Sequence, residues 1–214
     1  AHRAVLIGLH PGAHIGCQSE RFAHLVHQRL HDGTGRQRAQ RGLVDLADVG
    51  DRHVVEDGDR AGLCRCLIDP RRSETAEKCH VHLAIKPGTD AALAFAIMRE
   101  LVVNDWLDQD YIDKYTLGWD ALRERAMTWT LERAAEVCGV DAELIRALAK
   151  DWGTTRQAAI RLNYGMQRVK GGANAVRAIA CLPALTGAWR DKAGGLLLSS
   201  SSNFKVNKKD LYRP

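Results

Sequence analysis

The sequence predicts an α/β fold in which helices flank a mainly parallel sheet in three layers. Short apolar runs typical of buried strands alternate along the chain with amphipathic stretches of helical period, and this alternation favours parallel strands joined by helices. Hydrophobic residues make up 45% and charged residues 27% of the 214-residue chain, as in ordinary globular proteins. A chain of this length can hold one sizeable domain or two small ones.

The first part of the pattern contains two strands and a helix. Residues 66–70 form a short apolar run with an acid near its carboxyl end, which predicts a buried strand. Residues 81–85 predict a second strand. The Pro-Gly turn that follows offers Thr89 or Asp90 as the N-cap of a largely buried helix over residues 91–104.

Two further helices, a strand and a last helix complete the pattern. Thr130 and Asp141 are suited to cap two helices, with Gly139 as the stop between them. Residues 158–165 predict another strand. The helix that follows the next glycine pair is expected to break near Pro183, because proline lacks the N–H that a helix interior needs.

The composition of the chain changes near residue 66. Residues 1–66 contain no Lys, Asn, Met, Trp or Tyr, yet they hold seven of the nine His residues. We therefore divide the chain into an atypical His/Arg-rich segment, residues 1–66, and a partial α/β domain, residues 67–214. The favoured interpretation of the first segment is an out-of-frame reading of a GC-rich gene, or a disordered stretch. The alternative is a divergent extension with one amphipathic helix and a strand or two.

Charge and cysteine spacing bear on partners and location. The net charge of +5 divides into +1 for residues 1–66, from nine Arg and eight acids, and +4 for the remainder. It is not gathered into a basic motif, so we expect no nucleic-acid partner. The sequence has no run of 18 apolar residues, so we expect no membrane span. Six Cys residues without C-x-x-C spacing predict scattered thiols in a reducing compartment, the cytoplasm.

Three candidate binding segments follow the predicted strands. Asp69 ends the first strand, Pro87–Asp90 follows the second, and Tyr164–Arg168 follows the third. Ligands of parallel sheets bind beyond the carboxyl ends of the strands. We therefore expect these three segments to share a site.

The same segments resemble a known family. The motifs are IDPRR from Ile68, IKPGTD from Ile85, NYGMQ from Asn163 and LPALTG from Leu182. In this order and spacing they resemble the centre of the catalytic subunit of molybdopterin oxidoreductases, the dimethyl sulfoxide reductase superfamily, over about residues 67–214. The resemblance implies a redox enzyme that holds molybdenum or tungsten between two molybdopterin guanine dinucleotides, in many members beside a 4Fe-4S cluster.

The resemblance also implies that this segment contacts one of the dinucleotides. Asp69 would accept hydrogen bonds from ribose hydroxyls or a guanine edge, and Asp90 would accept the N1–H and N2–H₂ donors of guanine. The competing interpretation is that these acids only cap a turn and a helix. Arginines would bind the diphosphate, and a glycine would let the backbone approach it. The expected cofactor-binding residues are Asp69, Arg71, Arg72, Gly88, Thr89, Asp90, Tyr164 and Arg168, and no catalytic residue or metal ligand is expected.

The chain also departs from the family pattern. Residues 1–66 match neither the iron–sulfur cysteine motif nor the metal ligand that family members carry upstream, and the C-terminal cofactor domain is missing. We therefore expect a fragment that forms part of the cofactor-binding wall, does not ligate the cluster and is inactive alone. Electron-transfer subunits and, for the parent enzyme, a periplasmic location fit the family too. The alternative is a non-catalytic module that binds a guanine nucleotide or a partner subunit.

Overall fold

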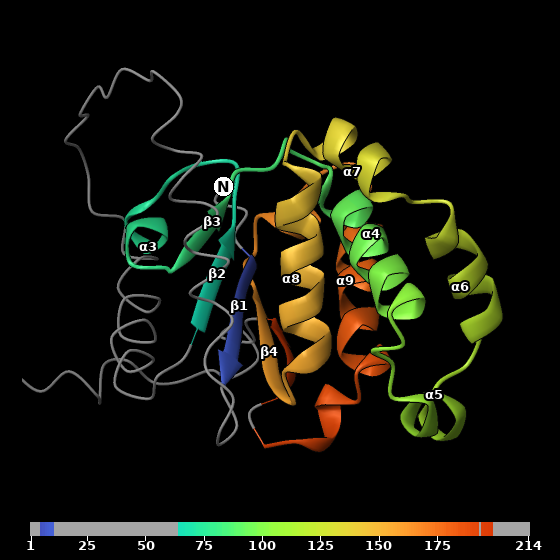
Figure 1. Cartoon of the computed structure of the whole chain (residues 1–214). Coiled ribbons are helices and arrows are strands. Elements are labelled where there is room, and N and C mark those ends of the chain that lie inside the picture. Colours follow the sequence, from blue (N-terminus) through green and yellow to red (C-terminus); the bar gives the residue numbers. More distant parts are fainter. Residues whose placement is uncertain (1–4, 11–63, 193, 199–214) are drawn as a thin grey trace, which may run out of the picture.

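The computed structural model describes residues 5–10, 64–192 and 194–198. In these ranges the strands form one sheet in the order β3-β2-β1-β4-β5, and α4, α8 and α9 stand beside it (Figure 1). The strands are β1 (Val5–His10), β2 (Cys64–Ile68), β3 (Val81–Leu83), β4 (Gln157–Leu162) and β5 (Gly195–Leu198).

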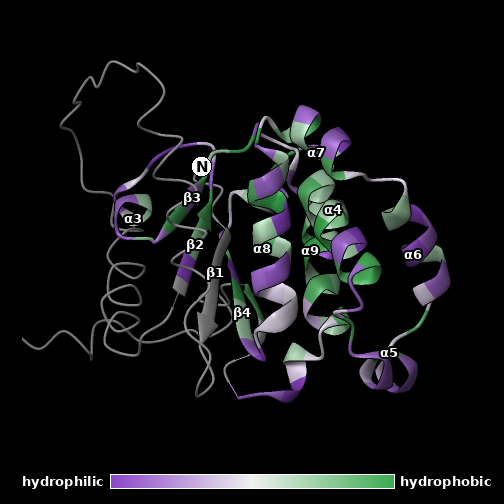
Figure 2. Ribbon diagram, viewed as in Figure 1, coloured by the Kyte–Doolittle hydropathy of each residue, from purple (hydrophilic) through white to green (hydrophobic). Residues whose placement is uncertain are grey.

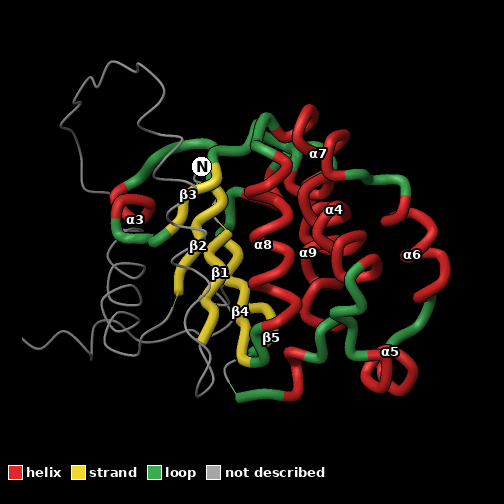
Figure 3. Tube along the Cα trace, in the orientation of Figure 1, coloured by secondary structure: helices red, strands yellow, loops and turns green. Residues whose placement is uncertain are grey.

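Helices account for most of the chain between β3 and β5 (Figure 3). They are α3 (Glu74–Glu77), α4 (Asp90–Val103), α5 (Gln109–Tyr115), α6 (Trp119–Met127), α7 (Leu131–Cys138), α8 (Ala142–Thr154) and α9 (Gly172–Leu185), with the short 3-10 turns η1 (Met166–Arg168) and η2 (Ala188–Arg190).

The sheet is mixed in direction. β2 pairs with β3 in parallel, and β4 pairs with β5 in parallel, whereas β1 is antiparallel to both β2 and β4. Four of the described strands therefore share one direction and β1 alone runs the other way. The α/β class is confirmed. The central strand was not predicted, and it comes from the segment that composition sets apart. The helix and strands expected within residues 11–63 lie outside the described residues.

Three predicted helix caps and stops are confirmed by the structure. The side chain of Thr130 accepts a hydrogen bond from the N–H of Arg133, and the side chain of Asp141 accepts one from the N–H of Glu143. Gly139 ends α7 with a left-handed φ of +71°, which a residue without a Cβ adopts at little cost.

The expected break at Pro183 was wrong. α9 continues through this residue to Leu185. The N–H of Thr186 donates to the carbonyl of Leu182 at 3.3 Å, so the last turn closes around the proline. Pro183 is buried, and packing of the helix face outweighs the single hydrogen bond that proline removes.

Helix α4 is the centre of the core. Leu93, Ile97 and Leu101 form the predicted apolar stripe and are 0–3% exposed, and Ala96 and Met98 are as deeply buried. The helix contacts α6, α7, α8 and α9. Figure 2 shows the apolar residues concentrated on α4, α9 and the strands, and polar residues on the outer sides of α5, α6 and α7. Burial on several faces explains why this helix shows little amphipathic character.

Gly187 provides a test of the junction between α9 and α5. It has a φ of +65°, and a Cβ there would collide with the carboxylate of Asp108. That carboxylate accepts hydrogen bonds from the N–H of Tyr111 at 2.9 Å and from Arg190 at 2.6 Å. We expect Gly187→Ala to lower the free energy of unfolding by about 2–3 kcal/mol, from left-handed strain and displacement of the cap, as measured by urea denaturation.

Gly118→Ala is the matched control for that variant. Gly118 has a φ of +77°, but a Cβ there meets no heavy atom within 4 Å. It should cost only the backbone strain of about 1–2 kcal/mol. Equal losses for the two variants would show that the contact with Asp108 contributes nothing.

The carboxyl of Asp151 near the end of α8 predicts a pH effect. Burial raises the pKa of Asp151 to about 6, and Lys150 opposes this shift only in part. Because the folded state then binds the proton more tightly than the unfolded chain, stability falls as pH rises from about 4 to about 6. We expect Asp151→Asn to flatten this slope and to gain about 1 kcal/mol at pH 7, a value reduced for partial solvent exposure.

Thermal or urea unfolding at a series of pH values measures this effect. Asp120→Asn is the control, because Asp120 lies exposed on α6. A slope between pH 4 and 6 that is the same in the Asp151→Asn variant and in the wild type would rule out the buried carboxyl as its source.

Candidate functional site

The predicted binding segments leave the sheet at one edge. Ile68 and Leu162 both pair with Val5 of β1, and Leu83 pairs with Ile68. The carboxyl ends of β2, β3 and β4 are therefore level. The chain runs outward from β2 to β3 on one side and from β4 to β5 on the other, so the region between β2 and β4 is a topological switch point. Ligands of open α/β sheets bind at such points.

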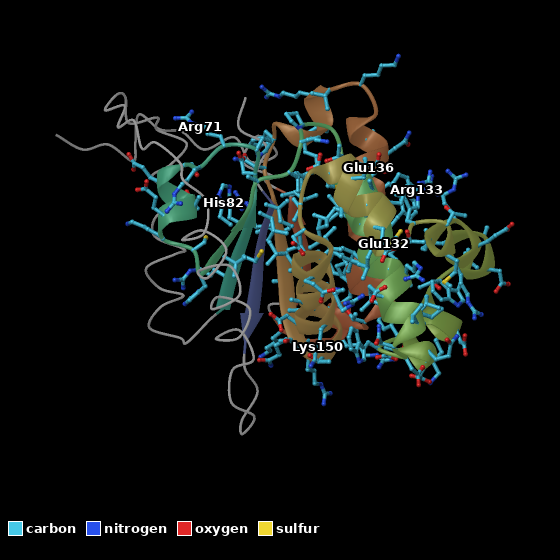
Figure 4. The ribbon with its side chains drawn as sticks, turned by 45° about the horizontal axis from the view of Figure 1, so that its top comes forward. Arg71, His82, Glu132, Arg133, Glu136 and Lys150 are labelled. Atoms are coloured by element: carbon cyan, nitrogen blue, oxygen red, sulfur yellow. The ribbon has the colours of Figure 1, made fainter. Side chains whose placement is uncertain are left out.

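Asp69 is held tightly at the end of β2. It is 5% exposed, and its N–H donates to the carbonyl of Leu83 at 3.2 Å. Its Oδ1 accepts the N–H of Arg71 at 2.7 Å, so the carboxylate does cap the turn. Its backbone carbonyl oxygen lies 2.9 Å from Nε2 of His82. Arg71 and Arg72 are exposed on the same turn. Figure 4 shows the Arg71 and His82 side chains on the β3 side of the molecule.

Residue Lys86 fixes the second segment against α7. Its N–H donates to the carbonyl of Cys138 at 2.8 Å, and its Nζ donates to the carbonyl of Glu136 at 3.0 Å. A cation at the carboxyl end of a helix satisfies open carbonyls and complements the helix dipole. Gly88 then turns the chain with a φ of +86°, and a Cβ there would meet nothing within 4 Å. The backbone at Gly88 is thus open to solvent.

Thr89 and Cys138 complete the junction with α7. The hydroxyl of Thr89 donates to the carbonyl of Lys86 at 2.7 Å, and it makes no capping hydrogen bond to α4. The Sγ of Cys138 donates to the carbonyl of Thr89 at 3.6 Å. Burial raises the pKa of the Cys138 thiol, which keeps this thiol protonated and able to donate.

Asp90 stands at the first turn of α4 and is 7% exposed. It borders a cavity of about 20 Å³, enough for one water molecule. The N-terminus of a helix favours a carboxylate, because the open N–H groups there carry partial positive charge. The other residues that line the cavity are apolar, and they come from β2, α4, β4 and α9: Ile68, Leu93, Ala94, Ile97, Ile160, Ile179 and Leu182.

The two acids approach the sheet edge from different sides. Ile68 points toward α4 and α9, where it lines the cavity with Asp90. Side chains alternate along a strand, so Asp69 leaves the strand end toward the opposite face. Both acids lie next to the carboxyl edge, and a ligand that contacts both has to lie across that edge.

The third segment packs against the start of α9. Tyr164 is half-buried, and Arg168 is exposed with its guanidinium carbon 6.0 Å from the Tyr164 ring centroid, at the limit of a cation–π contact. The N–H of Tyr164 is held by the side chain of Asn163 at 2.8 Å. A Cβ at Gly172 would collide with the carbonyl of Met166, so this glycine lets the segment sit close to α9.

Two residues make structural contacts at this edge that the sequence did not predict. Lys86 lies inside the IKPGTD motif but was given no function, and His82 was counted only as part of a strand. His82 had one usable signal: it is the polar residue between two buried neighbours, Val81 and Leu83, so strand alternation directs it away from the core.

Among the residues that the structure describes, no group of three or more His, Cys, Asp or Glu side chains is arranged to hold a metal ion. None of the helices described is long and apolar enough to cross a membrane.

Part of the chain is similar in sequence to several larger proteins. It is 35% identical over 161 residues to the probable oxidoreductase YoaE of Bacillus subtilis, covering 75% of this chain and 24% of that protein. It is 36% identical over 121 residues to the F420-dependent formate dehydrogenase subunit alpha of Methanocaldococcus jannaschii, covering 56% of this chain and 18% of the relative. It is 35% identical over 141 residues to the dimethyl sulfoxide reductase DmsA of Haemophilus influenzae, covering 56% of this chain and 18% of that protein. The chain thus spans about a quarter or less of these relatives.

A solved structure supports the same likeness at the level of the fold. The acetylene hydratase from Pelobacter acetylenicus superposes with a TM-score of 0.52 and 23% identity, covering 65% of this chain and 19% of the other. No protein-family model matches. Over part of its length, the chain is therefore similar to the molybdopterin oxidoreductases of the dimethyl sulfoxide reductase superfamily, which confirms the resemblance carried by its motifs.

Proposed function

We propose that the chain is part of a molybdenum or tungsten oxidoreductase and forms one wall of the site for a molybdopterin guanine dinucleotide. The meeting of three strand ends at one sheet edge supports this proposal. Because the chain corresponds to at most 24% of the relatives reported above, it supplies only some of the contacts that a preorganised site needs. We therefore propose that it is inactive alone.

The residues at this edge fit a guanylated dinucleotide. The carboxylate of Asp90 would accept the N1–H and N2–H₂ donors of guanine. The exposed guanidinium groups of Arg71 and Arg72 suit a diphosphate, because each presents planar paired donors. Asp69 would accept hydrogen bonds from ribose hydroxyls, and the open backbone at Gly88 would allow a close approach.

Further properties of the whole enzyme belong to the same proposal. The metal between two such dinucleotides would supply the redox chemistry, and this chain would bind and orient the dinucleotide. A 4Fe-4S cluster and electron-transfer subunits would come from elsewhere in the enzyme, and the compartment would be the cytoplasm. Tyr164, Arg168 and Thr89 would border the dinucleotide.

A second helical layer is also part of the proposal. Arg65 and Leu67 alternate with Ile68 and therefore face away from α4, yet they are 3% and 1% exposed. Arg65 donates to the carbonyl of Lys78, just after α3, at 3.2 Å. The burial of Arg65 and Leu67 on this face of the sheet supports a three-layer arrangement, with α3 at the edge of the third layer.

Guanine recognition by Asp90 can be measured with the intact chain. We expect GDP to bind with a dissociation constant near the millimolar range, and at least about tenfold more tightly than ADP. Adenine lacks the N1–H and N2–H₂ donors, and a lost charge-assisted pair is worth about 1.5–3 kcal/mol. Asp90→Asn should abolish the preference for GDP, as measured by isothermal titration calorimetry.

Asp120→Asn, on exposed α6, is the control for a lost negative charge and should keep the preference. Absence of GDP binding at millimolar concentration in the wild-type chain would contradict the proposed function. Equal binding of GDP and ADP would contradict the assignment of Asp90.

A further inference from the structure

His82 occupies a position that the proposed function does not explain. It lies on β3, is half-buried, and faces away from the core that Val81 and Leu83 join. Its Nε2 lies 2.9 Å from the backbone carbonyl oxygen of Asp69. The parallel ladder of β2 and β3 ends at the pair Ile68 and Leu83, so this side chain holds the chain one residue beyond the last ladder pair.

The contact fixes the peptide group that joins Asp69 to Pro70. The residue after Asp69 is Pro70, which has no N–H to donate and restricts the preceding residue to extended backbone. The N–H of Asp69 already donates to the carbonyl of Leu83. With the carbonyl held by His82, both backbone polar groups of Asp69 are anchored to β3, which sets the direction in which its side chain leaves the backbone.

The chemistry of the contact requires a proton on Nε2 of the histidine. A carbonyl oxygen can only accept, so Nε2 must carry the proton and donate. Both the Nε2–H neutral form and the doubly protonated form of imidazole meet this requirement. The hydrogen bond therefore persists whichever of these two forms is present. Because His82 is half-buried, this hydrogen bond is stronger than it would be in water.

We propose that His82 is a positioning residue for the turn of residues 69–72. By donating to the carbonyl of Asp69 it orients the Asp69 carboxylate and, through the hydrogen bond from the N–H of Arg71 to that carboxylate, the arginine turn that follows. The role of this turn in binding a dinucleotide rests on the proposed function. The control of the turn's geometry by His82 does not depend on the proposed function.

Amide hydrogen exchange of the intact chain without ligand tests this geometry. We expect His82→Ala to raise the exchange rate of the Arg71 amide about tenfold, because the backbone that carries the accepting carboxylate loses one of its anchors to β3. His82→Gln should restore most of the protection, since a glutamine amide can donate from nearly the same position. Unchanged exchange of the Arg71 amide in His82→Ala would overturn the inference, whether or not a nucleotide binds.

His80→Ala is the matched control. His80 comes just before β3, and its Nδ1 accepts the N–H of Arg65 at 3.1 Å, near the other end of β2. Loss of this contact should leave the exchange of the Arg71 amide unchanged. If His80→Ala raises that exchange as much as His82→Ala does, the effect is general loosening of the strand pair, and the assignment to His82 fails.

A binding experiment separates this inference from the proposed function. If wild-type chain binds GDP, His82→Ala should weaken binding about three- to tenfold, and the loss should disappear in the Asp69→Asn background, because both changes act through the same carboxylate. If the losses of GDP affinity caused by His82→Ala and Asp69→Asn are additive, His82 does not act through the Asp69 carboxylate. If wild-type chain binds no GDP, the proposed function fails, and the exchange data alone decide the role of His82.

Discussion

The structure depends on the burial of α4. This helix contacts four other helices, and with β2, β4 and α9 it encloses the small cavity behind Asp90. Its charged residue Glu100 is 4% exposed and is paired with Arg99 at 2.8 Å and with Arg146 of α8 at 3.9 Å. An unpaired charge in that position would be costly. These contacts, together with the clamp of Lys86 on α7, fix α4 near both ends and so fix the position of Asp90 at the sheet edge.

The features that the sequence predicted well are local. The caps at Thr130 and Asp141 and the stop at Gly139 follow from a few neighbouring residues. The two strands before the acid-bearing turns are confirmed, but they end at Ile68 and Leu83, two residues before the predicted ends. α5 was missed, since Ile112 is its buried residue and no apolar stripe marks it. It exists because Asp108 caps it and Arg190 holds that cap from a distant part of the chain. Such long-range contacts have no local signal.

The candidate site shows the same division. Asp69 and Asp90 could be proposed as candidates from the sequence, because each follows or precedes a recognisable element and their motifs resemble a family. The supports of those acids could not be found. The contacts of Lys86 with Glu136 and of His82 with Asp69 join residues 50 and 13 positions apart. Whether a polar side chain reaches a given carbonyl depends on the packing of whole elements, which a pattern of residue types does not specify.

The place of β1 in the sequence has a consequence for folding. Its pairing partners lie far along the chain: Val5 pairs with Leu162, 157 residues further on. Pairings of such wide sequence separation form slowly. Until then, a nascent strand with unsatisfied edges is vulnerable to wrong pairing and to chaperone capture. Completion of the sheet is therefore a late event in folding.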